Sequence, residues 1–179
     1  MRVGLVVMLL AGAAAAGPAT PPSSPYAGLD ARPLNAFSEQ EVADLESGRG
    51  MGLALAAELN GYPGPRHVLD LAEPLQLTAM QRNEAARLFA KMESGAVALG
   101  GKLLAREREL DALFAERRAT AETIAAASAA AADARGALRT HHLTYHLAMV
   151  ELLSLHQLEA YKVLRGYDGG NGRGGHGRH

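Results

Sequence analysis

The spacing of apolar residues between positions 78 and 152 constrains the fold more than any other feature. Small and apolar residues recur there at intervals of three and four, the period of a helix that presents one face to a partner. In the first half these residues are Ala85, Leu88, Met92, Ala96, Leu99, Leu103, Leu110 and Leu113. In the second half they are Ile124, Ala127, Ala131, Ala134, Leu138, His141, Tyr145, Ala148 and Leu152. We therefore expect two long helices, over about residues 79–117 and 121–152, packed as an antiparallel hairpin.

The composition favours a thin helical protein over a thick globular core. Aromatic residues make up 4% of the 179 residues, and alanine dominates the apolar fraction. At about 1.5 Å per residue each arm would be on the order of 50 Å long, so we expect an elongated all-α fold. The formal net charge of −1 does not indicate nucleic-acid binding. No nucleophile, paired-carboxylate or phosphate-loop motif indicates an enzyme.

The first 16 residues have the pattern of a secretory signal peptide. Arg2 precedes the apolar run 4–10, and alanines at 14–16 provide the expected cleavage site. A membrane anchor is the alternative, but a span needs about 20 apolar residues. We therefore expect export to the bacterial periplasm, with no membrane span after cleavage. Because the chain has no cysteine, a disulfide, a thiolate metal site and a lipid anchor on cysteine are excluded.

Both ends of the mature chain are expected to be flexible. Residues 17–37 form a leader whose first part is rich in Pro, Ser, Ala and Gly. The glycine-rich residues 168–179 form a tail that contains His176 and His179. This tail is expected to be disordered, and it is either a plain solubilising segment or a weak metal-binding tract. The folded domain is then expected over residues 38–167.

Shorter helices are expected on both sides of the hairpin. Ser38 and Glu41 have the spacing of a capping box, in which each side chain bonds the other residue's backbone amide. The turn residues 60–64 separate later segments, and Pro65 suits the first turn of a helix. The expected short helices cover about residues 39–46, 51–59, 65–74 and 155–164. Helices of this length are marginal alone, so we expect them to pack on the hairpin.

Two similar capping boxes bracket the hairpin. The first is Leu77-Thr78-Ala79-Met80-Gln81, and the second is Leu153-Ser154-Leu155-His156-Gln157. In each box the Thr or Ser hydroxyl can accept a hydrogen bond from the glutamine amide, while the glutamine side chain reaches back. The motif residues are therefore Leu77, Thr78, Gln81, Leu153, Ser154 and Gln157.

Together with the export signal, these boxes resemble the Spy/CpxP family of bacterial periplasmic proteins, which carry paired LTxxQ motifs. LTAMQ matches the motif fully, and LSLHQ replaces Thr with Ser, which keeps the capping hydroxyl. The resemblance covers about residues 38–167. It implies an all-helical, often dimeric fold. It also implies either ATP-independent chaperone activity during envelope stress or metal sensing, on which the family is divided.

The histidines provide a candidate metal site. His142 and His146 are four residues apart and therefore project from the same side of a helix. If the turn lies near Ala119, Glu93 is level with this pair, and His67 could fold back toward it. Two histidines and a carboxylate would suit Zn²⁺, Ni²⁺, Co²⁺ or Cu²⁺. The alternative is a pair of surface or interface histidines that are hydrogen-bonded to their neighbours.

A chaperone that works without ATP needs apolar surface bordered by charge. Apolar residues off the packing stripe, and flexible methionines, are candidates for such a surface: Phe89, Val97, Leu104, Phe114, Leu143, Leu147, Val150, Met80, Met92 and Met149. Each could instead be buried under the short helices or in a dimer interface.

These observations leave three functions open. The first is an ATP-independent periplasmic chaperone that binds unfolded or stressed envelope proteins and requires no cofactor. The second is a periplasmic protein that binds or senses a divalent metal. The third is a structural adaptor for one partner protein. A homodimer is expected, and neither catalysis nor nucleic-acid binding is.

Overall fold

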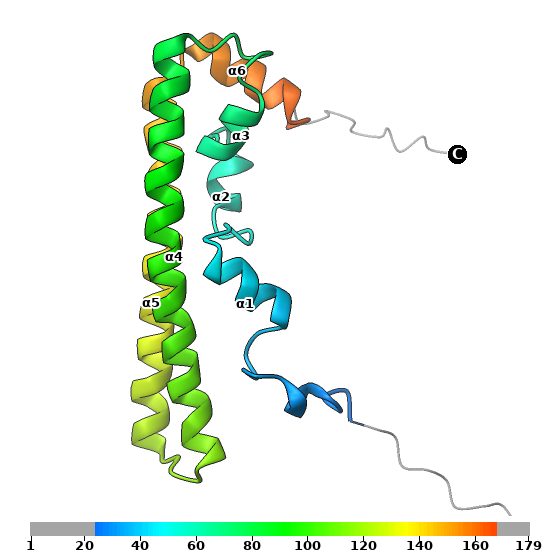
Figure 1. Cartoon of the computed structure of the whole chain (residues 1–179), viewed down its shortest axis with the longest axis vertical. Coiled ribbons are helices and arrows are strands. Elements are labelled where there is room, and N and C mark those ends of the chain that lie inside the picture. The colour runs from blue at the N-terminus through cyan, green and yellow to red at the C-terminus, as the bar shows by residue number, and fades with distance from the viewer. Residues whose placement is uncertain (1–23, 168–179) are drawn as a thin grey trace, which may run out of the picture. The chain divides into compact units, whose positions relative to one another are not determined.

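The computed structural model describes residues 24–167 (Figure 1). Residues 24–31 belong to a separate unit, which contains the 3-10 helix η1 (Leu29–Ala31). The remaining residues, 32–167, belong to one helical unit. The expected signal peptide (1–16) and the expected tail (168–179) lie outside the described residues.

Two long helices form the predicted antiparallel hairpin, so the all-α fold is confirmed (Figure 1). They are α4 (Ala79–Ala115) and α5 (Ala121–Leu152). The first helix ends two residues before the expected Arg117, which has a left-handed backbone with φ of 54° and cannot continue a right-handed helix. Thr120 caps α5 through a capping box with Thr123. Dimerisation remains an expectation.

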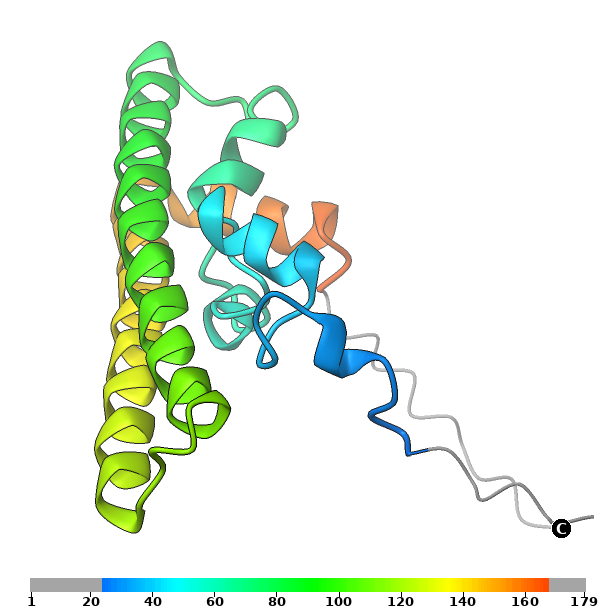
Figure 2. The ribbon, with the colours of Figure 1, turned by 60° about the horizontal axis from the view of Figure 1, so that its bottom comes forward.

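Three short helices follow one another along one side of the hairpin (Figures 1 and 2). They are α1 (Glu39–Glu46), α2 (Leu55–Glu58) and α3 (Pro65–Asp70). The first has the predicted Ser38 capping box. The second is shorter than the predicted 51–59, because Met51 and Gly52 have positive φ angles of 45° and 75°. Such backbone does not fit a right-handed helix.

The short segments cover the hairpin through two apolar clusters. One lies near α6 (Leu155–Leu164) and contains Val68, Ala72, Leu75, Leu77, Ala85, Met149, Leu153 and Tyr161. The other contains Leu34, Phe37, Leu45, Ala96, Leu103, Leu104 and Leu138. Leu34 and Phe37 belong to the expected leader, yet both are buried. The packed region therefore begins at Leu34 and not at Ser38.

Two glycines let α1 and the loop after it lie directly on α4. A Cβ atom at Gly100 would lie 2.5 Å from the carbonyl oxygen of Leu45, and one at Gly48 would lie 2.8 Å from that of Glu93. Real Cβ atoms do not approach a carbonyl oxygen so closely, so these contacts need residues without a side chain. This approach brings the loop of residues 47–52 against the middle of the hairpin.

Across residues 24–167, no helix combines the length and the apolar character that a membrane span requires.

Candidate functional site

The two LTxxQ-type boxes meet at the end of the hairpin. The Thr78 hydroxyl accepts from the Gln81 amide, and the Ser154 hydroxyl accepts from the Gln157 amide. Gln81 Nε2 donates to Gln157 Oε1 over 2.8 Å, and Gln157 Nε2 donates to Gln81 Oε1 over 3.1 Å. The motif leucines, Leu77 and Leu153, are buried in the same apolar cluster. Each box therefore caps its own helix and also fastens that helix to the other.

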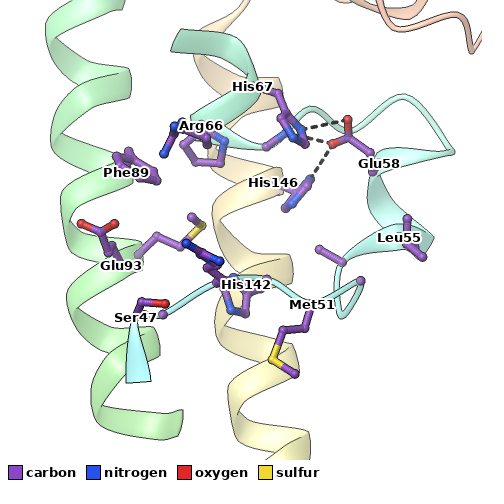
Figure 3. A pocket seen from close by; sticks show the side chains of 18 residues that line it. Ser47, Met51, Leu55, Glu58, Arg66, His67, Phe89, Glu93, His142 and His146 are labelled. Carbon is purple, nitrogen blue, oxygen red and sulfur yellow. Dashed lines mark hydrogen bonds and ion pairs between the residues drawn. The ribbon is translucent and has the colours of Figure 1, made fainter. Parts of the chain in front are cut away.

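A pocket of about 560 Å³ lies between the short segments and the middle of the hairpin (Figure 3). Phe89 and Glu93 reach it from α4, and His142 and His146 reach it from α5. The loop after α1, α2 and the start of α3 close the other side with Ser47, Met51, Leu55, Glu58, Arg66 and His67. The pocket thus exists only because the short segments pack on the hairpin.

His142 and His146 are both buried, because the short segments cover this side of α5. Nδ1 of His146 lies 2.7 Å from the Tyr62 carbonyl oxygen. A carbonyl only accepts, so Nδ1 carries a proton, and in the neutral ring Nε2 then holds the lone pair. His142 is 2% exposed, and its Nε2 has no hydrogen-bond partner among the described residues. Burial, with smaller contributions from His141 and His146, lowers the pKa of His142 to about 4, so its ring is neutral near pH 7.

Glu58 joins the short helices to the end of the chain. Its carboxylate accepts hydrogen bonds from Tyr161, from Tyr167 and from the Gly64 amide. Arg165 Nε lies 3.4 Å from the same carboxylate. The residue is 4% exposed, and burial alone would raise the pKa of its carboxylate. The neighbouring His67 and the hydrogen bonds from the tyrosines outweigh that effect and hold the pKa at about 2.

All four expected metal ligands line this one pocket: His67, Glu93, His142 and His146. His67 Nδ1 lies 3.2 Å from Glu58 Oε1, so it turns toward that carboxylate (Figure 3). Within residues 24–167, no three His, Asp or Glu side chains are close enough together to hold one metal ion. A metal site would therefore need these side chains to move.

Glu58 is the residue that the sequence analysis missed. It is the one charged residue in the apolar segment 51–59, and an isolated charge in such a segment is a signal of a buried, partnered group. Its partners Tyr161 and Tyr167 lie about a hundred residues away. Helical periodicity gives no information on contacts between such distant segments.

The candidate apolar contact residues divide into three groups. Phe89, Leu143 and Val150 are partly buried. Leu104, Met92 and Met149 are buried, as the packing alternative expected. Exposed large apolar side chains in the helical unit are Met51, Leu55, Leu59, Tyr62, Met80, Val97, Phe114, Leu147, Leu155, Val163 and Leu164. Met80 and Leu155, which lie inside the two motif boxes, are 75% and 83% exposed. Met80 also lines a shallow hollow with Leu152, bordered by charged Glu84 and Arg87.

Comparison with known proteins identified no similar protein. No family model, no curated protein and no solved structure matches the chain.

Proposed function

We propose that this protein is an ATP-independent periplasmic chaperone of the Spy/CpxP type. It binds unfolded or stressed envelope proteins and, as in the family it resembles, works as a homodimer. Two features support the proposal: the paired capping boxes and the helical hairpin that they bracket. The chemistry required is simple, since exposed apolar side chains contact the client while neighbouring charges keep the complex in solution.

The observation that carries the proposal is the exposure of Met80 and Leu155. Each is a large apolar residue in the first turn of a helix whose cap is fixed by the reciprocal Gln81–Gln157 pair. An LTxxQ-type box uses its leucine, its hydroxyl residue and its glutamine, and the two residues between the last two can be polar. Met80 is the fourth residue of the first box, and Leu155 is the third residue of the second. Apolar residues at these exposed positions do not contribute to the core, so a contact with another protein explains them.

The test is suppression of aggregation. Two unrelated denatured clients are diluted into buffer that contains chelator, no ATP and the mature chain (residues 17–179). Protection of both clients at near-stoichiometric amounts is expected, since a holdase acts by binding. Protection of neither client would overturn the proposal, and protection of one alone would favour a structural adaptor for a single partner. Analytical ultracentrifugation of the same sample tests the homodimer.

A matched pair of variants locates the client surface. The double variant Met80→Ser/Leu155→Ser should weaken protection of both clients, because it removes apolar contact area without disturbing a buried residue. Phe114→Ser is the control, since Phe114 is also exposed but lies near the turn between α4 and α5. Equal protection by both variants would exclude the motif boxes as the client surface.

A second candidate function is metal binding, favoured by the convergence of four expected ligands on one pocket. His146 suits this role because its Nδ1–H bond to Tyr62 orients Nε2, as backbone carbonyls do for many ligating histidines. Calorimetric titration with Zn²⁺, Ni²⁺, Co²⁺ and Cu²⁺ tests it. Affinity should be lost in His142→Ala/His146→Ala and kept in His156→Ala, whose histidine is exposed on α6. Unchanged affinity in the double variant would exclude this site.

A further inference from the structure

The pocket of about 560 Å³ described above has the size and lining of a small-molecule site. Such sites are about 300–1,000 Å³, mostly apolar, and have a few converging polar groups. Here Met51, Leu55, Phe89 and Met92 supply apolar side chains, and the buried ring of His142 supplies a polar group. We propose that this pocket binds a phenol group, either as a free molecule or as the tyrosine side chain of another protein.

The apolar lining favours an aromatic ring. Methionine sulfur makes favourable contacts with aromatic rings, and Met51 and Met92 both line the pocket. Phe89 offers an aromatic partner for an edge-to-face contact, and Arg66 already lies 5.6 Å from the centre of its ring. A planar ring also suits a site between two helices and a loop, because it needs few torsions to be fixed.

His142 explains why the ring should carry a hydroxyl. A buried imidazole nitrogen without a partner costs stability, and His142 Nε2 has none among the described residues. The nitrogen is either a donor or an acceptor, depending on the tautomer, and a hydroxyl can serve as the partner of either. Nε2 has almost no accessible surface in this structure, so the His142 ring would have to turn for a bound phenol to satisfy this unpaired group.

The charged side chains around the pocket favour a neutral ligand. Arg49 pairs with Asp44 at 2.8 Å, and Arg66 pairs with Asp70 at 3.2 Å. Glu58 is occupied by the tyrosines and Arg165, as described above. Within the part of the chain that the structure describes, Glu93 alone among these charges forms no ion pair, and it is exposed at the edge. No unpaired buried charge is thus left to attract a charged organic ligand.

The test compares p-cresol with toluene, which differ only in the hydroxyl. Both are titrated by NMR into the mature chain in chelator, and methyl resonances of Met51 and Met92 report on the pocket. We expect p-cresol to bind about tenfold more tightly than toluene, as one added hydrogen bond provides. Absence of shifts at these methyls with either compound at millimolar concentration would overturn the proposal.

Two variants separate the hydroxyl contact from simple occupancy. His142→Leu should abolish the preference for p-cresol and leave toluene binding in place. Gly50→Leu should block both compounds, since a Cβ atom there would lie 4.0 Å from the His142 ring, an ordinary contact, and the longer side chain would cover it. Gly136→Leu is the matched control, because its Cβ atom would meet nothing. A p-cresol preference that survives His142→Leu would refute the role of His142.

A peptide distinguishes the two sources of the phenol. A blocked pentapeptide with a central tyrosine, and its phenylalanine analogue, are added to the protein with p-cresol bound. Displacement by the tyrosine peptide alone identifies a protein side chain as the occupant, whereas no displacement identifies a free phenol. Binding of p-cresol does not depend on the chaperone activity, so protection of clients and occupancy of the pocket can fail separately.

Discussion

Gln81 and Gln157 donate hydrogen bonds to each other's side-chain oxygen, with Nε2–Oε1 distances of 2.8 and 3.1 Å. Each amide also bonds a carbonyl outside its own box: Gln81 donates to Leu152, and Gln157 donates to Leu75. The glutamine of each LTxxQ-type box therefore has two roles. It completes the cap of its own helix, and it ties together the start of α4, the end of α5 and the start of α6.

Replacement of this pair should cost more than the loss of an ordinary cap. We expect Gln157→Ala to lower the free energy of unfolding by about 2–3 kcal/mol, because it removes a cap and leaves buried partners unpaired. Urea denaturation followed by circular dichroism measures the change. Thr123→Ala is the control, because its capping box is exposed, and it should cost about 1 kcal/mol.

A double-mutant cycle tests the coupling directly. Gln81→Ala and Gln157→Ala together should cost less than the sum of the single variants by about 0.5–1.5 kcal/mol, since each single variant already breaks the shared pair. Strict additivity would mean that the two boxes act independently.

Gly95 should not tolerate alanine. The His141 ring occupies the space that a Cβ atom at Gly95 needs, and its Nε2 donates to the Met92 carbonyl over 2.9 Å. We expect Gly95→Ala to destabilise the fold by about 1–3 kcal/mol, although alanine is the better helix former. Gly101→Ala, in the same helix with open space around it, should stabilise by about 0.5–1 kcal/mol. Thermal denaturation of the two variants should therefore show shifts of opposite sign.

Glu58 should contribute far more to stability than an exposed carboxylate. Glu58→Gln weakens the bonds from Tyr161 and Tyr167 and the interaction with Arg165, so we expect a loss of about 2–3 kcal/mol. Glu73→Gln removes an exposed pair with Arg82 and should change stability by no more than about 0.5 kcal/mol. Chemical denaturation near neutral pH compares the two variants. Similar small losses would contradict the role of Glu58 as a junction.

Acid should weaken the fold through His142 before it acts on Glu58. The unfolded chain protonates His142 near pH 6.5, whereas the folded protein resists until about pH 4 because burial lowers the pKa. This contribution is complete above pH 6.5 and disappears as pH falls toward 4, a loss on the order of 3 kcal/mol. Glu58, with a pKa of about 2 in place of 4.5, loses its contribution only below about pH 4.5.

The pH dependence is measured as the free energy of unfolding in urea at about pH 7 and about pH 5, with chelator present. His142→Leu should show a smaller difference between the two values than the unchanged protein, because it removes the group that titrates. His141 and His146 flank His142 and remain in both proteins. An identical difference in the two proteins would show that His142 does not cause it.

The hairpin was predictable because its signals are local. The three–four spacing, the Thr78 cap and the short turn depend on neighbours in the chain, and α5 begins and ends at the expected residues. The antiparallel register also followed, since a short turn leaves little freedom, and His141 lies against Gly95 near its expected level. The burial of His142 and His146 did not follow, because it depends on which side of α5 the short helices cover.

The sequence by itself determined the helices, their caps and the hairpin, because hydrogen bonds and side-chain spacing within a few residues set them. It also identified the four candidate metal ligands, but not the residues that surround them. Only the tertiary structure decided that Gln81 meets Gln157, that Glu58 meets Tyr161, and that the loop of residues 47–52 closes a pocket over His142. These contacts join segments that are far apart in the chain. They form where small surfaces pack together, and helical periodicity in the sequence does not predict which surfaces meet.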